Sequence, residues 1–318
     1  MIPCVASAVD IDWVTIGDPG NACDPQPIPP DGCFGSVDYT YRMAKYEVTN
    51  AQYVEFLNAV AASDPNGLYQ PGMTSGDRGL PGTIVRSGSD GSFTYTAIPD
   101  RQNKPVGFVT FPSAMRFANW IHNGQPTGAQ HATTTEDGAY TITTEGIAQN
   151  TITRNPGANF FIPTEDEWFK AAYYDAVSTT YFDYATGFDD PVVCTTPGST
   201  PNTANCGVTL SDLFYGRRDL ADVGSYTGSA SPSGTFDQVG NMGEWNETIL
   251  LSRFRVQRGA SWGWGAELHR ADSRFAAEAL RVDARLGLRL ASVPEPGTSS
   301  LLLLGLLGLA ARSWRKGS

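Results

Sequence analysis

Residues 234–248 read GTFDQVGNMGEWNET, and this stretch decides the expected fold of the 318-residue chain. Asp237 and Glu244 supply hard oxygen donors, and Gly240 between them allows a turn that points backbone carbonyls inward. Calcium takes about six to eight such oxygens, so the stretch suits a calcium site. The spacing alone is more typical of a surface turn with two solvated acids. The rest of the chain has to decide between these interpretations.

Apolar residues at helical spacing, each preceded by a capping residue, predict three helices on the N-terminal side of this stretch. Thr49 with Gln52 is expected to cap the first helix, and Thr164 with Glu167 the third. The second helix is expected to begin after Thr110 or Ser113 and to stop at Gly124.

Strands are harder to place, and five short runs are candidates: 108–111, 139–143, 151–154, 160–163 and 286–292. Residues 63–104 and 178–235 are expected to be long loops. Loops of that length are usually functional or are held in place, for instance by a disulfide or a metal.

Four cysteines bracket two short loops. Cys23 and Cys33 enclose a proline-rich segment, and Cys194 and Cys206 enclose another segment rich in turn residues. We predict one disulfide across each loop, which places the protein in an oxidising compartment. Four unrelated buried thiols are the alternative. Cys4 is left over at the N-terminus.

Both ends of the chain are predicted to lie outside the fold. Residues 1–8 end in Ala6-Ser7-Ala8, a signal-peptidase pattern, and are interpreted as the remnant of a signal peptide, with an ordinary terminus as the alternative. Residues 292–318 contain Pro294-Glu295-Pro296, an apolar run and a basic tail. That order resembles the PEP-CTERM sorting signal of bacterial proteins processed by exosortases, with membrane contact through 298–311; a plain tail anchor is the alternative.

Composition excludes one class of partner. The net charge of −11 repels phosphate backbones, and no basic patch interleaved with aromatic residues is present, so no nucleic acid is expected. Hydrophobic residues make up 41%, which is enough for a sizeable core.

The order of six blocks carries a family resemblance that covers roughly residues 37–291. The blocks resemble the formylglycine-generating-enzyme (sulfatase-modifying factor) family. The resemblance implies one α/β (α+β) domain over residues 9–291, compact, C-type-lectin-like, loop-rich and supported by disulfides and calcium. The blocks are KYEVTNAQYVEFLNAV, PVGFVTFPSAMRFANWIHNG, FFIPTEDEWFKAAYYD, GTFDQVGNMGEWNET, RVQRGASW and LGLRLAS.

The resemblance also implies calcium ligands. Asp237 and Glu244 correspond to side-chain ligands, and Gly240 and Met242 to backbone-carbonyl ligands. For a second calcium site the counterparts are Asn205 and Asp219, in a loop that matches the family poorly.

Residues 258–265 read RGASWGWG and mark the expected site. In active enzymes of this family two cysteines follow closely, bind copper and oxidise a cysteine of a sulfatase. In this sequence the corresponding positions fall near Trp264 and Ala266, and neither is a cysteine. No catalytic residue and no copper are therefore expected. Trp262, Trp264, Arg258 and Ser261 are the candidate ligand-binding residues, and core packing is the alternative for the tryptophans.

These observations together favour an exported protein of the cell surface or extracellular matrix that binds a peptide or a glycan. A metal-dependent oxidase or hydroxylase with a different site is the alternative, and a purely structural matrix component is a third. His122, His131 and His269 show no metal-binding spacing and are interpreted as structural.

Mass spectrometry of the protein recovered from its native envelope tests the assignment of the two ends. We expect a mature chain without residues 1–8 and without the segment after Pro294-Glu295-Pro296, and with two disulfides. Recovery of the uncut C-terminus would support the tail anchor instead.

Overall fold

The computed structural model describes residues 8–25, 32–77, 81–207 and 219–293. Nearly all of the predicted signal-peptide remnant lies outside these ranges, as do Pro294-Glu295-Pro296 and the segment 298–311 expected to contact the membrane. Within the described ranges, no helix is long and apolar enough to cross a membrane.

The fold is mixed α/β and loop-rich, as the resemblance implies. The helices are α1 Asn50–Val60, α2 Gly72–Ser75, α3 Phe111–His122, α4 Thr144–Gln149 and α5 Glu165–Tyr173, with single turns at Ala132–Glu136 and Ala266–His269. The strands are β1 Trp13–Ile16, β2 Asp24–Pro25, β3 Cys33–Phe34, β4 Tyr41–Ala44, β5 Ile84–Ser87, β6 Thr94–Ala97, β7 Phe160–Phe161, β8 Tyr174–Asp175, β9 Thr180–Tyr181, β10 Val193–Cys194, β11 Thr203–Ala204, β12 Gly243–Leu250, β13 Phe254–Arg258, β14 Phe275–Glu278, β15 Leu286–Gly287 and β16 Ala291–Ser292.

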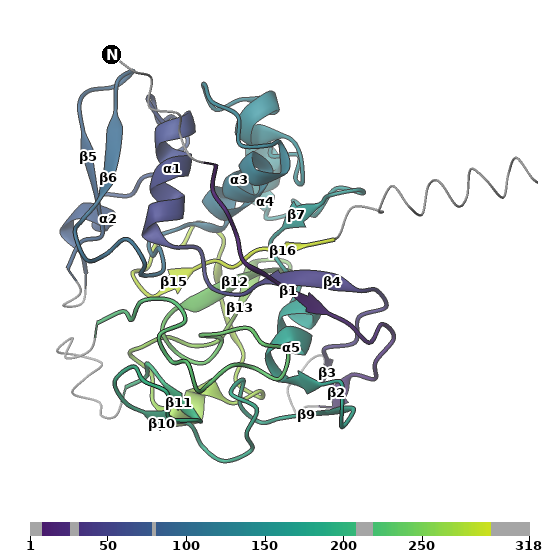
Figure 1. The fold of residues 1–318 in the computed structure, drawn as a ribbon. Coiled ribbons are helices and arrows are strands. Elements are labelled where there is room, and N and C mark those ends of the chain that lie inside the picture. The colour runs from purple at the N-terminus through teal and green to yellow at the C-terminus, as the bar shows by residue number, and fades with distance from the viewer. Residues whose placement is uncertain (1–7, 26–31, 78–80, 208–218, 294–318) are drawn as a thin grey trace, which may run out of the picture.

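Two four-stranded sheets form the centre of the molecule, one in the order β1-β4-β16-β7 and the other in the order β14-β13-β12-β15. Helices α1, α3 and α4 gather at one end, and the loops that carry β10 and β11 lie at the other (Figure 1). The predicted loop 63–104 contains α2 and the β5–β6 hairpin, which the sequence did not reveal. The region 178–235 carries strands of two residues each within the part that the structure describes.

The predicted helix caps are confirmed. Thr49 and Gln52 form a capping box at α1, and Thr164 and Glu167 form another at α5. At α3 the cap is Thr110, whose side chain accepts a hydrogen bond from the Ser113 amide.

Three of the predicted strands are wrong: one contains a backbone conformation that strands do not adopt, and in the other two side chains bind the backbone groups that a strand would pair. Phe108 has a φ of 62°, which strands do not adopt, and Phe111 already begins α3. The Asn119 side chain donates to the Tyr140 carbonyl and accepts from the Tyr140 amide, in place of a strand partner for 139–143. Arg255 likewise binds the carbonyl of Ile152 in the run 151–154.

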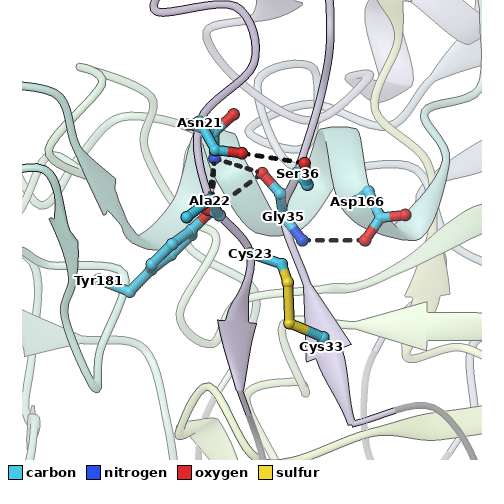
Figure 2. The surroundings of a disulfide bond; sticks show 8 residues. All are labelled: Asn21, Ala22, Cys23, Cys33, Gly35, Ser36, Asp166 and Tyr181. Carbon is cyan, nitrogen blue, oxygen red and sulfur yellow. Dashed lines mark hydrogen bonds between the residues drawn. A yellow bond between two sulfur atoms is a disulfide. The ribbon is translucent and has the colours of Figure 1, made fainter.

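Both predicted disulfides are present, Cys23–Cys33 and Cys194–Cys206. The first lies beside the start of α5, where the Gly35 amide donates to Asp166 at 2.9 Å (Figure 2). Asn21 donates to the Gly35 carbonyl at 2.7 Å and to Tyr181. The disulfide therefore joins an N-terminal loop that is also tied to α5 by hydrogen bonds.

A buried ion pair between Glu244 and Arg289 lies at the centre of the fold, and both side chains are fully buried. The Trp168 indole of α5 donates to Glu244 at 2.7 Å. Arg289 also donates through Nη1 to the carbonyl of Ala44 and through Nη2 to the carbonyl of Phe236. Because every charged atom has a partner, the pair avoids the large cost of an uncompensated buried charge.

Glu244→Gln should destabilise the protein by about 3–5 kcal/mol, because it leaves the Arg289 guanidinium buried without its counter-charge. Glu278→Gln is the matched control, since Glu278 forms an exposed ion pair with Arg253. Its expected cost is below about 1 kcal/mol. Denaturant unfolding measures both, and equal costs would contradict the role given to the buried pair.

Candidate functional site

A cavity of about 520 Å³ opens between β13, β14 and the two loops 260–264 and 280–286. Trp264 and Phe275 supply aromatic surface, and Gln257 and Ser261 supply neutral polar groups. The charged residues that line the cavity are Arg258, Glu278, Arg281, Asp283 and Arg285.

The loop after β13 is held against the block 237–244 by backbone hydrogen bonds. The Gly240 amide donates to the Gly259 carbonyl, and the Trp262 amide donates to the Asn241 carbonyl, each at 3.0 Å. Gly259 has a φ of +94°, a conformation in which a side chain is strained. The RGASWGWG segment is therefore fixed in place by the DQVGNMGE block.

The structure separates the four candidate binding residues. Trp262 is 1% exposed and packs in the hydrophobic core, so its ring is not open to a ligand. Arg258 is also buried; its guanidinium pairs with Glu165 at 2.7 Å and donates to two backbone carbonyls. Trp262 is therefore a core residue, which was the alternative to a role in ligand binding. The Arg258 guanidinium is already paired with groups of the protein.

Trp264, Ser261 and Arg258 line the cavity. Trp264 is half-buried and stacks on Phe275, with the ring centroids 6.0 Å apart, while the Arg285 guanidinium lies 5.5 Å from the Trp264 ring. Ser261 is 2% exposed, and its hydroxyl has no hydrogen-bond partner within the described residues. A buried hydroxyl without a partner is costly, so a ligand that bonds to it gains affinity.

The three histidines are apart from one another and each has a local partner. The His269 ring nitrogens lie 2.9 Å and 3.1 Å from the carbonyls of Gly259 and Trp264, and burial lowers the pKa of His269. His122 accepts from the Asn159 amide, and His131 caps a turn. His269 therefore braces the loop that carries Trp264.

Asp283 on the cavity wall is a residue that the sequence analysis missed. It accepts hydrogen bonds from Arg281 and from Arg285, on either side of it in the sequence. Burial by itself raises the pKa of Asp283, but these hydrogen bonds outweigh burial and lower the pKa to about 2. The alternation Arg281-Val-Asp283-Ala-Arg285 is the sequence signal that could have identified this charged rim.

The residues of the DQVGNMGE block that the resemblance assigns to calcium have protein contacts. Both Glu244 oxygens accept hydrogen bonds from Arg289, and one also accepts from Trp168. Asp237 is buried, which raises its pKa to about 6, and it accepts from the Gly224 amide. Among the described residues, no three histidine, cysteine or acidic side chains group closely enough to hold a metal ion.

The other residues of the predicted calcium sites also have protein contacts. Gly240 lies so close to the Asn205 carbonyl that a Cβ would meet it at 2.3 Å. Asn205 donates to the Asp219 carbonyl and to Asn241, and Asp219 forms an ion pair with Arg101. Calcium at Asp237, Gly240, Met242 and Glu244, and at a second site with Asn205 and Asp219, stays a prediction that rests on the resemblance.

Comparison with known proteins gives two family matches. The model of the sulfatase-modifying factor enzyme 1-like domain matches residues 36–293. The model of the PEP-CTERM protein-sorting motif matches residues 292–316. No curated protein matches the sequence.

Two solved structures share the fold at low sequence identity. CarF has 19% identity and a TM-score of 0.55, with 90% of this chain and 99% of that chain covered. Treponema denticola variable protein 1 has 16% identity and a TM-score of 0.55, with 91% of this chain and 98% of that chain covered. At these identities the likeness shows the fold alone.

The low pKa of Asp283 predicts a pH-dependent contribution to stability. The folded pKa of about 2 lies below the ordinary value of 3.8, so the contribution is present above about pH 4 and is lost as the pH falls towards 2. Asp283→Asn should remove about 2 kcal/mol of the stability difference between these pH values. The exposed Asp90→Asn is the control, and an unchanged pH profile in Asp283→Asn would contradict the assignment.

Proposed function

The chain belongs to the family of sulfatase-modifying factor enzyme 1-like domains, and we propose that it is an exported member that binds a ligand beside Trp264 instead of oxidising a cysteine. The observation that carries this proposal is that Trp264 and Ser261 line a cavity. Both residues belong to the segment next to which the family's reactive cysteines are expected.

The distribution of thiols supports the loss of the oxidase chemistry. Copper(I) is held by soft ligands such as thiolates, and the sequence has no cysteine after Cys206. Trp264 and Ala266 stand near the positions of the family's cysteine pair. The cysteines of the domain are used in the disulfides Cys23–Cys33 and Cys194–Cys206.

The shape and position of the cavity favour an extended peptide as the ligand. Strand β14 lines the cavity and is the edge of its sheet in the order β14-β13-β12-β15. An edge strand offers backbone donors and acceptors to an added strand, and neighbouring pockets then select its side chains. Trp264 and Phe275 would contact an apolar side chain of the peptide, and Ser261 would bond to a polar group.

The sorting motif supports an exported location. A PEP-CTERM motif implies export, anchoring of the C-terminus in the membrane during sorting, and processing by an exosortase-type enzyme. The two disulfides agree with an oxidising compartment. We place the mature domain at the cell surface or in the extracellular matrix.

Trp264→Ala should weaken binding of peptides selected from a library by about tenfold or more, because buried tryptophans dominate binding energy at interfaces. Trp13→Ala is the matched control: Trp13 also contacts a phenylalanine and an arginine, but it does not line the cavity. Calorimetric titration of both variants measures the difference.

Equal affinity of Trp264→Ala and the wild type would overturn the proposed site. Binding on a glycan array without binding to any peptide would overturn the choice of a peptide. Absence of binding in both screens would leave the purely structural role.

A further inference from the structure

The wall of the cavity at Trp264 carries a surplus of positive charge, although the chain as a whole has a net charge of −11. Arg281 and Arg285 share one acid, Asp283, which accepts hydrogen bonds from both guanidinium groups. The low pKa of Asp283 keeps this acid ionised. Two arginines and one carboxylate leave one positive charge at this wall without a counter-charge.

The other charged residues of the cavity do not cancel that surplus. Glu278 forms its own ion pair with Arg253. Arg258 pairs with Glu165, and Arg274 pairs with the same carboxylate, so this buried group also has two arginines for one acid. The cavity is therefore suited to an anionic ligand.

Arg285 is the arginine best placed to meet a ligand. Its Nε and Nη2 donate to Asp283, and its Nη1 has no hydrogen-bond partner among the described residues. Its guanidinium lies 5.5 Å from the centroid of the Trp264 ring. Its carbonyl accepts from the Gly243 amide at 3.0 Å, and its amide donates to Asp283 at 3.0 Å. These bonds fix the backbone from which the guanidinium extends.

Ser261 supplies a second donor beside Trp264. Its hydroxyl is buried at the cavity and has no partner within the described ranges. Its carbonyl accepts from the Trp264 amide at 2.9 Å, which keeps the two residues together. A carboxylate accepts hydrogen bonds from hydroxyl and guanidinium groups alike, so it can satisfy both donors.

The distance between Trp264 and Arg285 sets the spacing within a ligand. In an extended peptide, side chains two residues apart point to the same face and lie about 7 Å apart, and adjacent side chains point to opposite faces. That separation is close to the 5.5 Å between the Trp264 ring and the Arg285 guanidinium. An apolar residue at Trp264 thus places the residue two positions away beside Arg285.

We propose that the cavity selects peptides with an acidic residue two positions away from the apolar residue at Trp264, and that Arg285 and Arg281 bind the acidic side chain. A side chain suits the site better than a chain end, because a strand added to β14 continues past the cavity. The inference rests on the proposed function of this cavity and names its ligand class.

Calorimetric titration of the full chain with four capped heptapeptides tests the spacing and the charge. The peptides are acetyl-TETLTET-amide, its neutral form TQTLTQT, its basic form TKTLTKT, and TTELETT, which has the same composition with the acids next to leucine. The caps remove the terminal charges. TETLTET should bind about tenfold more tightly than TQTLTQT or TTELETT, because only its acids reach the arginines, and TKTLTKT should bind most weakly.

Arg285→Gln should remove the preference for TETLTET over TQTLTQT, because it removes the unpartnered donor and its charge. Arg281 is half-exposed, so Arg281→Glu leaves the core untouched and should shift the preference towards TKTLTKT. Arg86→Gln is the matched control: Arg86 is exposed and also lies over aromatic rings, but it does not line the cavity. It should leave all four affinities unchanged.

Equal binding of TETLTET and TQTLTQT, with both lost in Trp264→Ala, would overturn this inference and leave the proposed peptide site standing. Equal weakening in Arg86→Gln would also overturn it, since it would indicate a general effect of net charge. So would neutral TQTLTQT with a free carboxyl end that binds as tightly as capped TETLTET. Binding of TETLTET that is unchanged in Trp264→Ala, or no binding of any peptide, would instead contradict the proposed function together with this inference.

Discussion

The buried ion pair of Glu244 with Arg289 is the contact on which the rest of the structure depends. It joins the start of β12 to the segment between β15 and β16, and its hydrogen bonds extend to α5, to the end of β4 and to the loop before the DQVGNMGE block. These segments come from all parts of the domain. Because the pair is fully buried, its partners have to hold their positions for its charge to be balanced.

The ion pair also determines the geometry of the cavity at Trp264. The DQVGNMGE block that it holds binds the backbone of the RGASWGWG segment through Gly240 and Asn241. His269 braces the same segment at the carbonyls of Gly259 and Trp264. The scaffold thus presents a fixed loop to the cavity, and we propose that the chain uses it for binding, because no thiol is there to support oxidation.

Much of the fold could be predicted from the sequence, and the errors have identifiable causes. Helix caps such as Thr49 with Gln52 are local patterns, and so are cysteines that enclose a short loop. The strand predicted at 139–143 is wrong because the Asn119 side chain takes the backbone hydrogen bonds of Tyr140. The local sequence pattern does not reveal this contact with a distant residue. Within the site, Trp262 and Trp264 both adjoin glycine in the sequence, and packing alone decides that one is buried and the other faces the cavity.

The metal content of the protein tests the central claim most directly, because it separates a binding domain from a metal-dependent oxidase or hydroxylase built on the same fold. The measurement is elemental analysis of the protein purified from its native envelope, after calcium has been removed by chelation. A binding domain should contain copper and iron far below one atom per chain. Stoichiometric copper or iron that remains bound would contradict it.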